Sequence, residues 1–132
     1  MSFFECVASR NYAAIDFYDG SIMYDFANGK TTICDIDLFH KQPCVNDMGR
    51  MWGSSRFQSP EEYQLGADID EITNVYTLGA TAFALFGEYN RTREKWQLSD
   101  KLFEIATRAV SDDRTKRQQS IRQFTAEWEA AQ

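Results

Sequence analysis

Residues 70–86 are apolar on nearly every side of the helix that their spacing predicts. A helix of this kind must be covered by the rest of the chain on all sides, so it is expected at the centre of the fold. Its apolar and small residues at core spacing are Ile72, Val75, Tyr76, Gly79, Ala82, Phe83 and Phe86, with Leu78, Ala80, Ala84 and Leu85 opposite.

The second half of the chain continues in helices, over residues 60–131. Ser59-Pro60-Glu61-Glu62 has the pattern of a capping box, with proline at the first helical position. A third helix is indicated by apolar residues at helical spacing from Leu98 to Ala109. Ile121, Phe124 and Trp128 predict a fourth helix, which we expect to start near Arg117.

The first half predicts one β-hairpin and a long loop. Residues 21–26 alternate polar and apolar side chains, Asn28-Gly29 is a strong turn signal, and residues 31–34 are the return strand. Residues 35–59 show no periodicity, and a loop of this length is usually functional. With no linker or repeat in 132 residues, we expect a single domain over residues 1–132, of the α+β class: mainly α with a small β-hairpin.

Composition excludes several classes of protein. The net charge of −6 argues against a general nucleic-acid surface. No apolar run approaches a membrane span, and the start of the chain does not resemble a signal peptide, so no membrane partner is expected. Three cysteines without a CxxC pair favour a reduced, cytoplasmic protein, and the single histidine excludes a site made of several histidines.

Carboxylates mark the candidate chemistry. Asp35 and Asp37 follow the predicted hairpin, and side chains two apart in an extended segment point to the same side. Two such carboxylates repel unless a cation lies between them, and magnesium bound through phosphates is the natural partner. A solvated acidic turn is the alternative. Asp16 lies between Ile15 and Phe17, so it is either a paired structural group or a general base.

The order of these features resembles the large, C-terminal lobe of a protein-kinase-like domain. Residues 11–23 look like the family's catalytic loop, with Asp16 at the catalytic aspartate and Ser21 where the magnesium-binding asparagine usually stands. Residues 35–37 look like the Asp-Phe-Gly metal motif, with Asp35 at the metal-binding aspartate.

The resemblance continues to the last helix. Residues 38–61 correspond to an activation segment, which ends at Gly53–Glu61 in a stretch similar to Gly-Thr-x-x-Tyr-x-Ala-Pro-Glu. Asn74–Gly79 is similar to the Asp-x-Trp-Ser-x-Gly run of the central helix, and Arg117 matches the arginine that pairs with the family's Ala-Pro-Glu glutamate, here Glu61. This segment favours the Ser/Thr protein-kinase type.

The resemblance implies ATP- and magnesium-dependent phosphoryl transfer to a protein hydroxyl. Asp16 would be the catalytic residue. Asp35 and Ser21 would bind the cofactor, with Asp37 as an additional metal ligand. Glu61, Arg117 and Asn74 would be structural. Ala14, Ile15, Ser21, Ile36, Asp37 and Asn74 depart from the family's pattern.

The chain contains neither a Gly-rich loop nor a Val-Ala-x-Lys strand, the two small-lobe elements that hold the phosphates in this family. We therefore expect a truncated lobe that is inactive alone, with the missing small lobe or another protein as partner. Its uncovered apolar surface predicts a homodimer, or an exchange of N-terminal segments.

Two alternatives remain open. A non-catalytic, pseudokinase-type protein-binding module would explain the departures at Ala14, Ile15, Ser21 and Asp37. A fragment of a small-molecule kinase of the aminoglycoside or choline type would explain Asp35-Ile36-Asp37 in place of Asp-Phe-Gly. Such enzymes lack an activation segment of the form seen at Gly53–Glu61.

Overall fold

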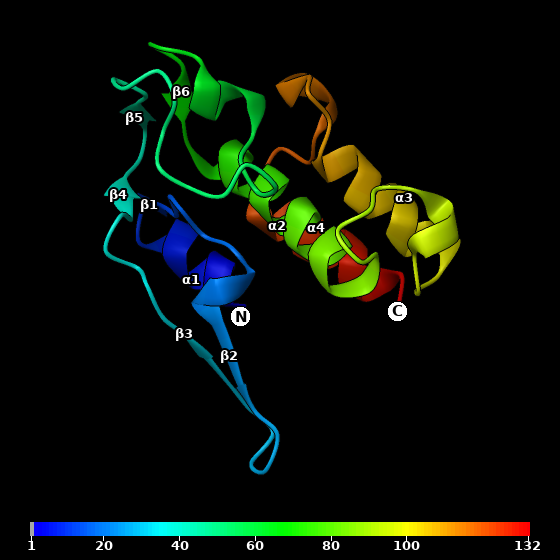
Figure 1. The fold of residues 1–132 in the computed structure, drawn as a ribbon. Helices are drawn as coiled ribbons and strands as arrows, with labels where there is room; N and C mark the ends of the chain where they lie inside the picture. Colours follow the sequence, from blue (N-terminus) through cyan, green and yellow to red (C-terminus); the bar gives the residue numbers. More distant parts are fainter. Residues whose placement is uncertain (1) are drawn as a thin grey trace.

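Residues 2–132, the part of the chain that the computed structural model describes, form four α-helices and six short β-strands. This arrangement confirms the α+β class, mainly helical with small antiparallel sheets (Figure 1). In the described part of the chain, no helix combines the length and the apolar character needed to cross a bilayer. The elements are α1 Phe3–Ser9, β1 Tyr12–Ala13, β2 Ile22–Asp25, β3 Lys30–Ile33, β4 His40–Lys41, β5 Cys44–Val45, β6 Asp68–Ile69, α2 Glu71–Phe86, α3 Asp100–Ala109 and α4 Ile121–Ala130.

Helix α2 is central, as its sequence predicts, and α3 and α4 lie beside it (Figure 1). It begins at Asp70, whose carboxylate accepts hydrogen bonds from the backbone N–H groups of Ile72 and Thr73. At Gly79 the backbones of α2 and α3 come so close that a Cβ atom would lie 2.7 Å from the Cβ of Ala109. Glycine at this position therefore sets the spacing between the two helices.

The main hydrophobic core joins all four helices. Phe83 and Val75 of α2 are fully enclosed, and the ring of Phe83 packs on that of Trp96 at 5.2 Å between centroids. The other buried members are Phe4, Ala14, Phe17, Ala82, Leu102, Ile105, Ala106, Ala109, Ile121 and Phe124. The core lies under the segment that leaves β1, because Ala14 and Phe17 on either side of Asp16 belong to it.

The fourth helix starts at Ile121, four residues later than the sequence pattern predicts. Ser120 is its N-cap, with the hydroxyl accepting a hydrogen bond from the N–H of Gln123. Arg117 is extended instead, because its side chain turns inward to a carboxylate in a distant part of the chain. The helical pattern of the sequence therefore begins before α4, in a segment that tertiary contacts keep extended.

Strands β2 and β3 form the predicted hairpin, with Ile22 opposite Ile33 and Asp25 opposite Lys30. Residues 26–29 make the turn, and the carboxylate of Asp25 accepts hydrogen bonds from the N–H groups of Ala27 and Asn28. The hairpin projects away from the helices at the lower edge of Figure 1. Residues 23–30 are all exposed, and Phe26 in the turn is 89% exposed.

The long loop of residues 35–59 is tied down by two short strands that the sequence did not reveal. Strand β4 pairs with β1, and β5 pairs with β6, which precedes α2. Four buried side chains form a second small core beneath these pairs: Ala13, Ile15, Met51 and Ile69. Each pair is two residues long, which is too short to give a period in the sequence.

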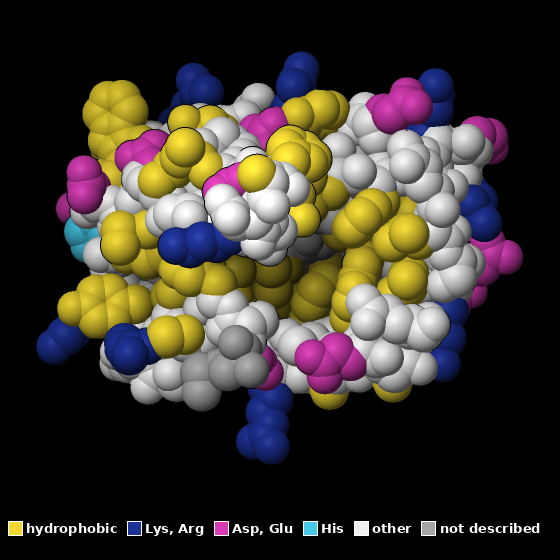
Figure 2. Space-filling view, turned by 90° about the horizontal axis from the view of Figure 1, so that it is seen from below, with side chains coloured by type: hydrophobic (Ala, Val, Ile, Leu, Met, Phe, Trp, Pro, Cys, Tyr) yellow, Lys and Arg dark blue, Asp and Glu magenta, His cyan; other side chains and the backbone are white. Residues whose placement is uncertain are grey.

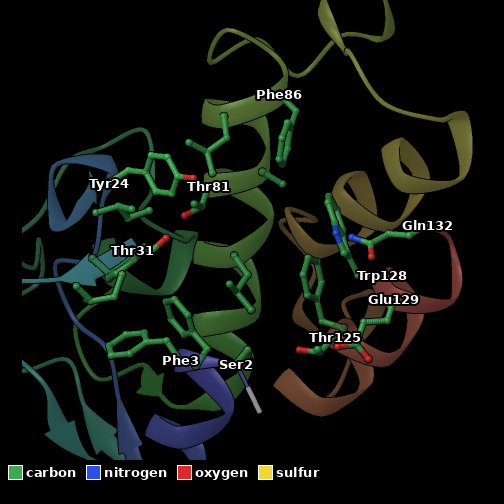
Figure 3. A pocket seen from close by; sticks show the side chains of 18 residues that line it. Ser2, Phe3, Tyr24, Thr31, Thr81, Phe86, Thr125, Trp128, Glu129 and Gln132 are labelled. Carbon is green, nitrogen blue, oxygen red and sulfur yellow. The ribbon is translucent and has the colours of Figure 1, made fainter. Parts of the chain in front are cut away.

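One flank of α2 is not covered, contrary to the prediction that the whole helix is enclosed. Leu85 is 54% exposed and, with Leu78, faces an apolar hollow of about 670 Å³. We call this hollow the apolar groove (Figures 2 and 3). It lies between α1, α2, α4 and the hairpin, and its lining includes Phe3, Tyr24, Thr31, Phe86, Trp128 and Glu129.

Candidate functional site

Asp16 stands where the chain leaves β1 and turns sharply. Ala14 and Ile15 before it and Phe17 after it are buried, so the backbone is fixed on both sides. Asp16 itself has a φ of 59°, in the left-handed region that non-glycine residues rarely adopt. Its carboxylate is only partly covered. Strain of this kind persists only where surrounding contacts impose it, and it is often found at functional sites.

Asn74 of α2 holds this turn in place. Its Nδ2 donates to the carbonyl of Ala14 at 2.7 Å, and its Oδ1 accepts from the N–H of the same residue at 2.7 Å. Both groups are buried, so the amide side chain satisfies the backbone there as a neighbouring strand would. A carboxylate in place of Asn74 could accept from the N–H but could not donate to the carbonyl.

Asp35 follows strand β3 and lies close to Asp16. Its φ of 59° equals that of Asp16, so two successive site segments turn through a left-handed aspartate. Burial raises the pKa of Asp16, and the nearby charge of Asp35 raises that pKa further. The Asp35 side chain is exposed. The two carboxylates therefore form an acidic pair open to solvent on one side.

Ser21 and Asp37 do not complete a cluster around Asp35. Ser21 is fully buried, its hydroxyl facing the N–H of Tyr18 at 3.5 Å and its carbonyl accepting from the N–H of Cys34 at 2.9 Å. Asp37 is exposed. Among residues 2–132, no three His, Cys, Asp or Glu side chains come together as metal ligands. Of the predicted metal ligands, Asp35 is exposed and its charge acts on Asp16, whereas Ser21 is enclosed.

The segment from Gly53 to Glu61 begins against Asp16. Gly53 has a φ of 140°, and a Cβ there would lie 3.3 Å from Oδ1 of Asp16 and 3.1 Å from Nε2 of Gln58. The buried Gln58 donates from Nε2 to the carbonyls of Met51 and Trp52. Its Oε1 accepts from the hydroxyl of Tyr63 at 2.8 Å. Glycine is favoured here by its positive φ, and the absence of a side chain lets the chain pass close to the Asp16 carboxylate.

Glu61 and Arg117 make the ion pair that the resemblance implies. Nη1 of Arg117 lies 2.6 Å from Oε1 of Glu61, and Nη2 lies 2.9 Å from Oε2. Arg114 also contacts Glu61 and makes two hydrogen bonds to the carboxylate of Asp70, the N-cap of α2. Burial opposes the charge on Glu61, but the hydrogen bonds and charges of the arginines outweigh it and lower its pKa.

The neighbouring Glu62 has the opposite environment. Its Oε2 accepts hydrogen bonds from the backbone N–H and hydroxyl of Ser59 at 2.7 and 2.9 Å, without a direct cationic partner. Burial dominates and raises its pKa to about 7. The predicted capping pattern at Ser59–Glu62 is therefore present, but it starts a short 3₁₀ turn, Pro60–Tyr63, instead of an α-helix.

Comparison with models of known protein families and with curated proteins finds no match.

Three contributors to the site were missed from the sequence. Gln58 bonds to residues of its own loop and turn, Arg114 bonds to partners distant in the chain, and no local pattern marks either residue. Tyr89 lies in a turn where Glu88 and Tyr89 both have positive φ. Its hydroxyl donates to the carboxylate of Asp19, and the guanidinium of Arg56 lies 4.8 Å from its ring centre. Nothing in the sequence marks Glu88 and Tyr89 as residues of positive φ, because neither is glycine or asparagine, the types that adopt this conformation most readily.

The arrangement places one carboxylate suited to accepting a proton beside another suited to a cation. Asp16 is partly covered and has a raised pKa, so it binds a proton more readily than a solvated aspartate. Asp35 offers exposed oxygen atoms of the type that magnesium prefers. One or two protein carboxylates are the usual number where phosphate oxygens supply the remaining ligands.

Proposed function

We propose that this chain carries half of a magnesium-dependent phosphoryl-transfer site, with a hydroxyl of a protein as the acceptor. The pairing of Asp16 with Asp35 on two strained, left-handed turns is the observation that carries the proposal. Asn74 supports it, because it fixes the backbone two residues before Asp16 from within the core.

Each residue has a definite task in this proposal. Asp16 accepts or orients the proton of the acceptor hydroxyl. Asp35 binds magnesium, which when present neutralises charge on the phosphates of ATP. Ser21, being enclosed, supports the turn after Asp16 through its backbone and is not a ligand. Trp52 and Arg56, exposed on the segment beside Asp16, offer contacts for a protein substrate.

Transfer by this chain on its own is expected to be negligible. Phosphoryl transfer depends on positioning and on charge stabilisation from several sides. The 132 residues contain no Gly-rich loop and no Val-Ala-x-Lys lysine. A second protein that supplies these groups would have to cover the acidic pair.

The first test is a calorimetric titration of the chain with Mg-ATP, alongside Asp35→Ala. We expect saturable, magnesium-dependent binding that Asp35→Ala abolishes. Asp112→Ala is the matched control, because Asp112 is an exposed aspartate far from the site in sequence and without an ion pair among residues 2–132. No binding at millimolar ATP, or equal loss in both variants, would contradict the proposal.

A second candidate is a non-catalytic protein-binding module. The enclosure of Ser21 favours it, because the residue that would stand as a second metal ligand faces the interior. In this case the segment around Trp52 binds a partner and Mg-ATP does not bind. The titration separates the two candidates, since only a phosphoryl-transfer site requires the acidic pair to hold a nucleotide with its metal.

A further inference from the structure

The apolar groove and the tip of the hairpin are two uncovered apolar features of one molecule. The groove is floored by side chains of α2 and α4 that include Leu85, Phe86 and Trp128 (Figure 3). The hairpin tip, residues 24–30, carries Phe26 and Tyr24, whose rings pack edge to face at 4.8 Å. Both features expose large apolar side chains, which a monomer in water rarely leaves uncovered together.

The two features lie next to each other on the same side of the molecule. Tyr24 and Thr31 at the two ends of the hairpin tip form one wall of the groove, so the tip is continuous with its rim. Figure 2 shows the hydrophobic side chains gathered in the hollow. In an arrangement of this kind, a two-fold axis near the rim brings the tip of each copy to the groove of the other.

The charges of the two features are complementary. Glu129 is the only charged residue among those that line the groove. Lys30 is the cation of the hairpin tip, while Asp25 opposite it is occupied by hydrogen bonds to the turn. Among residues 2–132, neither Lys30 nor Glu129 has an ion-pair partner. The positive charge of Lys30 on the tip and the negative charge of Glu129 in the groove therefore favour insertion of the tip into the groove of another copy.

We propose that this chain forms a two-fold homodimer in which the hairpin tip of each copy fills the apolar groove of its partner. Phe26 is the anchor, because it is the most exposed large apolar side chain of the described residues and stands at the end of the hairpin. Lys30 of one copy then lies near Glu129 of the other. The occupant of the groove is a second copy of this chain, and neither Asp16 nor Asp35 lines the groove.

The test is the concentration dependence of the mass, by sedimentation velocity or light scattering, from about 5 to about 500 µM. We expect a monomer–dimer equilibrium in which Phe26→Ser and Leu85→Asp each raise the dimer Kd at least tenfold. Both side chains are largely exposed, so the variants should fold, which circular dichroism checks. Leu65→Ser is the matched control, because Leu65 is 69% exposed but does not line the groove.

Mixing the two variants tests the reciprocal exchange. In a mixed dimer, the intact tip of the Leu85→Asp chain meets the intact groove of the Phe26→Ser chain, so one of the two contacts is restored. The mixture should therefore associate at least severalfold more tightly than either variant alone. A monomer at every concentration, a dimer unaffected by either variant, or a mixture no tighter than its components would overturn the proposal.

Discussion

At the scale of single residues, the site depends on side chains that replace missing backbone partners. Ala14 lies just beyond the two-residue strand β1, so its backbone groups have no strand beside them. Asn74 provides both hydrogen bonds from a helix sixty positions away in the sequence. The position of Asp16 is thus set by one amide side chain in the core.

Replacing Asn74 with alanine should destabilise the fold by about 3 kcal/mol, because two buried backbone groups of Ala14 lose their partners. Denaturant unfolding measures the loss. Thr77→Val is the control on the same helix, since among residues 2–132 the hydroxyl of Thr77 bonds only to the carbonyl of Thr73 one turn earlier. Equal losses of unfolding free energy in the two variants would show that the hydrogen bonds between Asn74 and Ala14 stabilise the fold no more than the local Thr77 hydrogen bond does.

At the scale of elements, Glu61 ties the 3₁₀ turn Pro60–Tyr63 to the segment before α4. Arg117 is its main partner, and Thr73 of α2 donates to the same carboxylate at 3.0 Å. The ring of Tyr76 lies beneath the guanidinium of Arg117, 5.0 Å from its carbon atom. Three elements far apart in the chain therefore meet at one buried carboxylate.

Breaking this pair should be costly. Arg117→Leu leaves Glu61 buried with fewer cationic partners, and the free energy of unfolding should fall by about 3 to 5 kcal/mol. Arg114→Leu, which removes the partly exposed arginine at the same carboxylate, should cost less. Thermal unfolding of both variants ranks them. A smaller loss for Arg117→Leu than for Arg114→Leu would contradict the assignment of Arg117 as the main partner.

The elements also show what the sequence could and could not predict. The hairpin and α2 were predicted close to their observed bounds, because turn chemistry and helical periodicity are local signals. The start of α4 was predicted four residues early, because the buried Arg117 reads locally as a helical residue. Of the candidate site residues, Asp35 lies near enough for its charge to act on Asp16, whereas the burial of Ser21 depends on packing that no local pattern encodes.

At the scale of the whole molecule, two adjacent glutamates make stability depend on pH in opposite directions. Glu61 has a lowered pKa, so its contribution is present above the ordinary glutamate range and is lost as the pH falls through its folded pKa. Glu62 has a pKa raised to about 7 from 4.5, so the folded state holds its proton longer than the unfolded chain. Ionisation of Glu62 therefore lowers stability as the pH rises from 4.5 to about 7.

Replacing Glu62 with glutamine should remove the second effect. The neutral amide resembles the protonated acid, so Glu62→Gln should be about as stable as the parent near pH 5. At pH 8 it should be more stable, by at most about 3 kcal/mol. Thermal unfolding from pH 4 to 8 measures the difference. Parallel profiles for the two proteins would show that Glu62 titrates normally in the folded state.

The contacts that α2 makes with two other segments limit where the chain can accept an inserted residue. Its first two turns present Thr73 to Glu61 and Asn74 to Ala14, each from its own side of the helix. One residue inserted after Asp70 would rotate both side chains by about 100° around the helix axis. Neither partner could follow, since each is fixed elsewhere. Insertions should therefore be excluded from the start of α2, whereas the folding of one copy should tolerate them in the exposed hairpin turn, residues 26–29, at the cost of the proposed dimer contact.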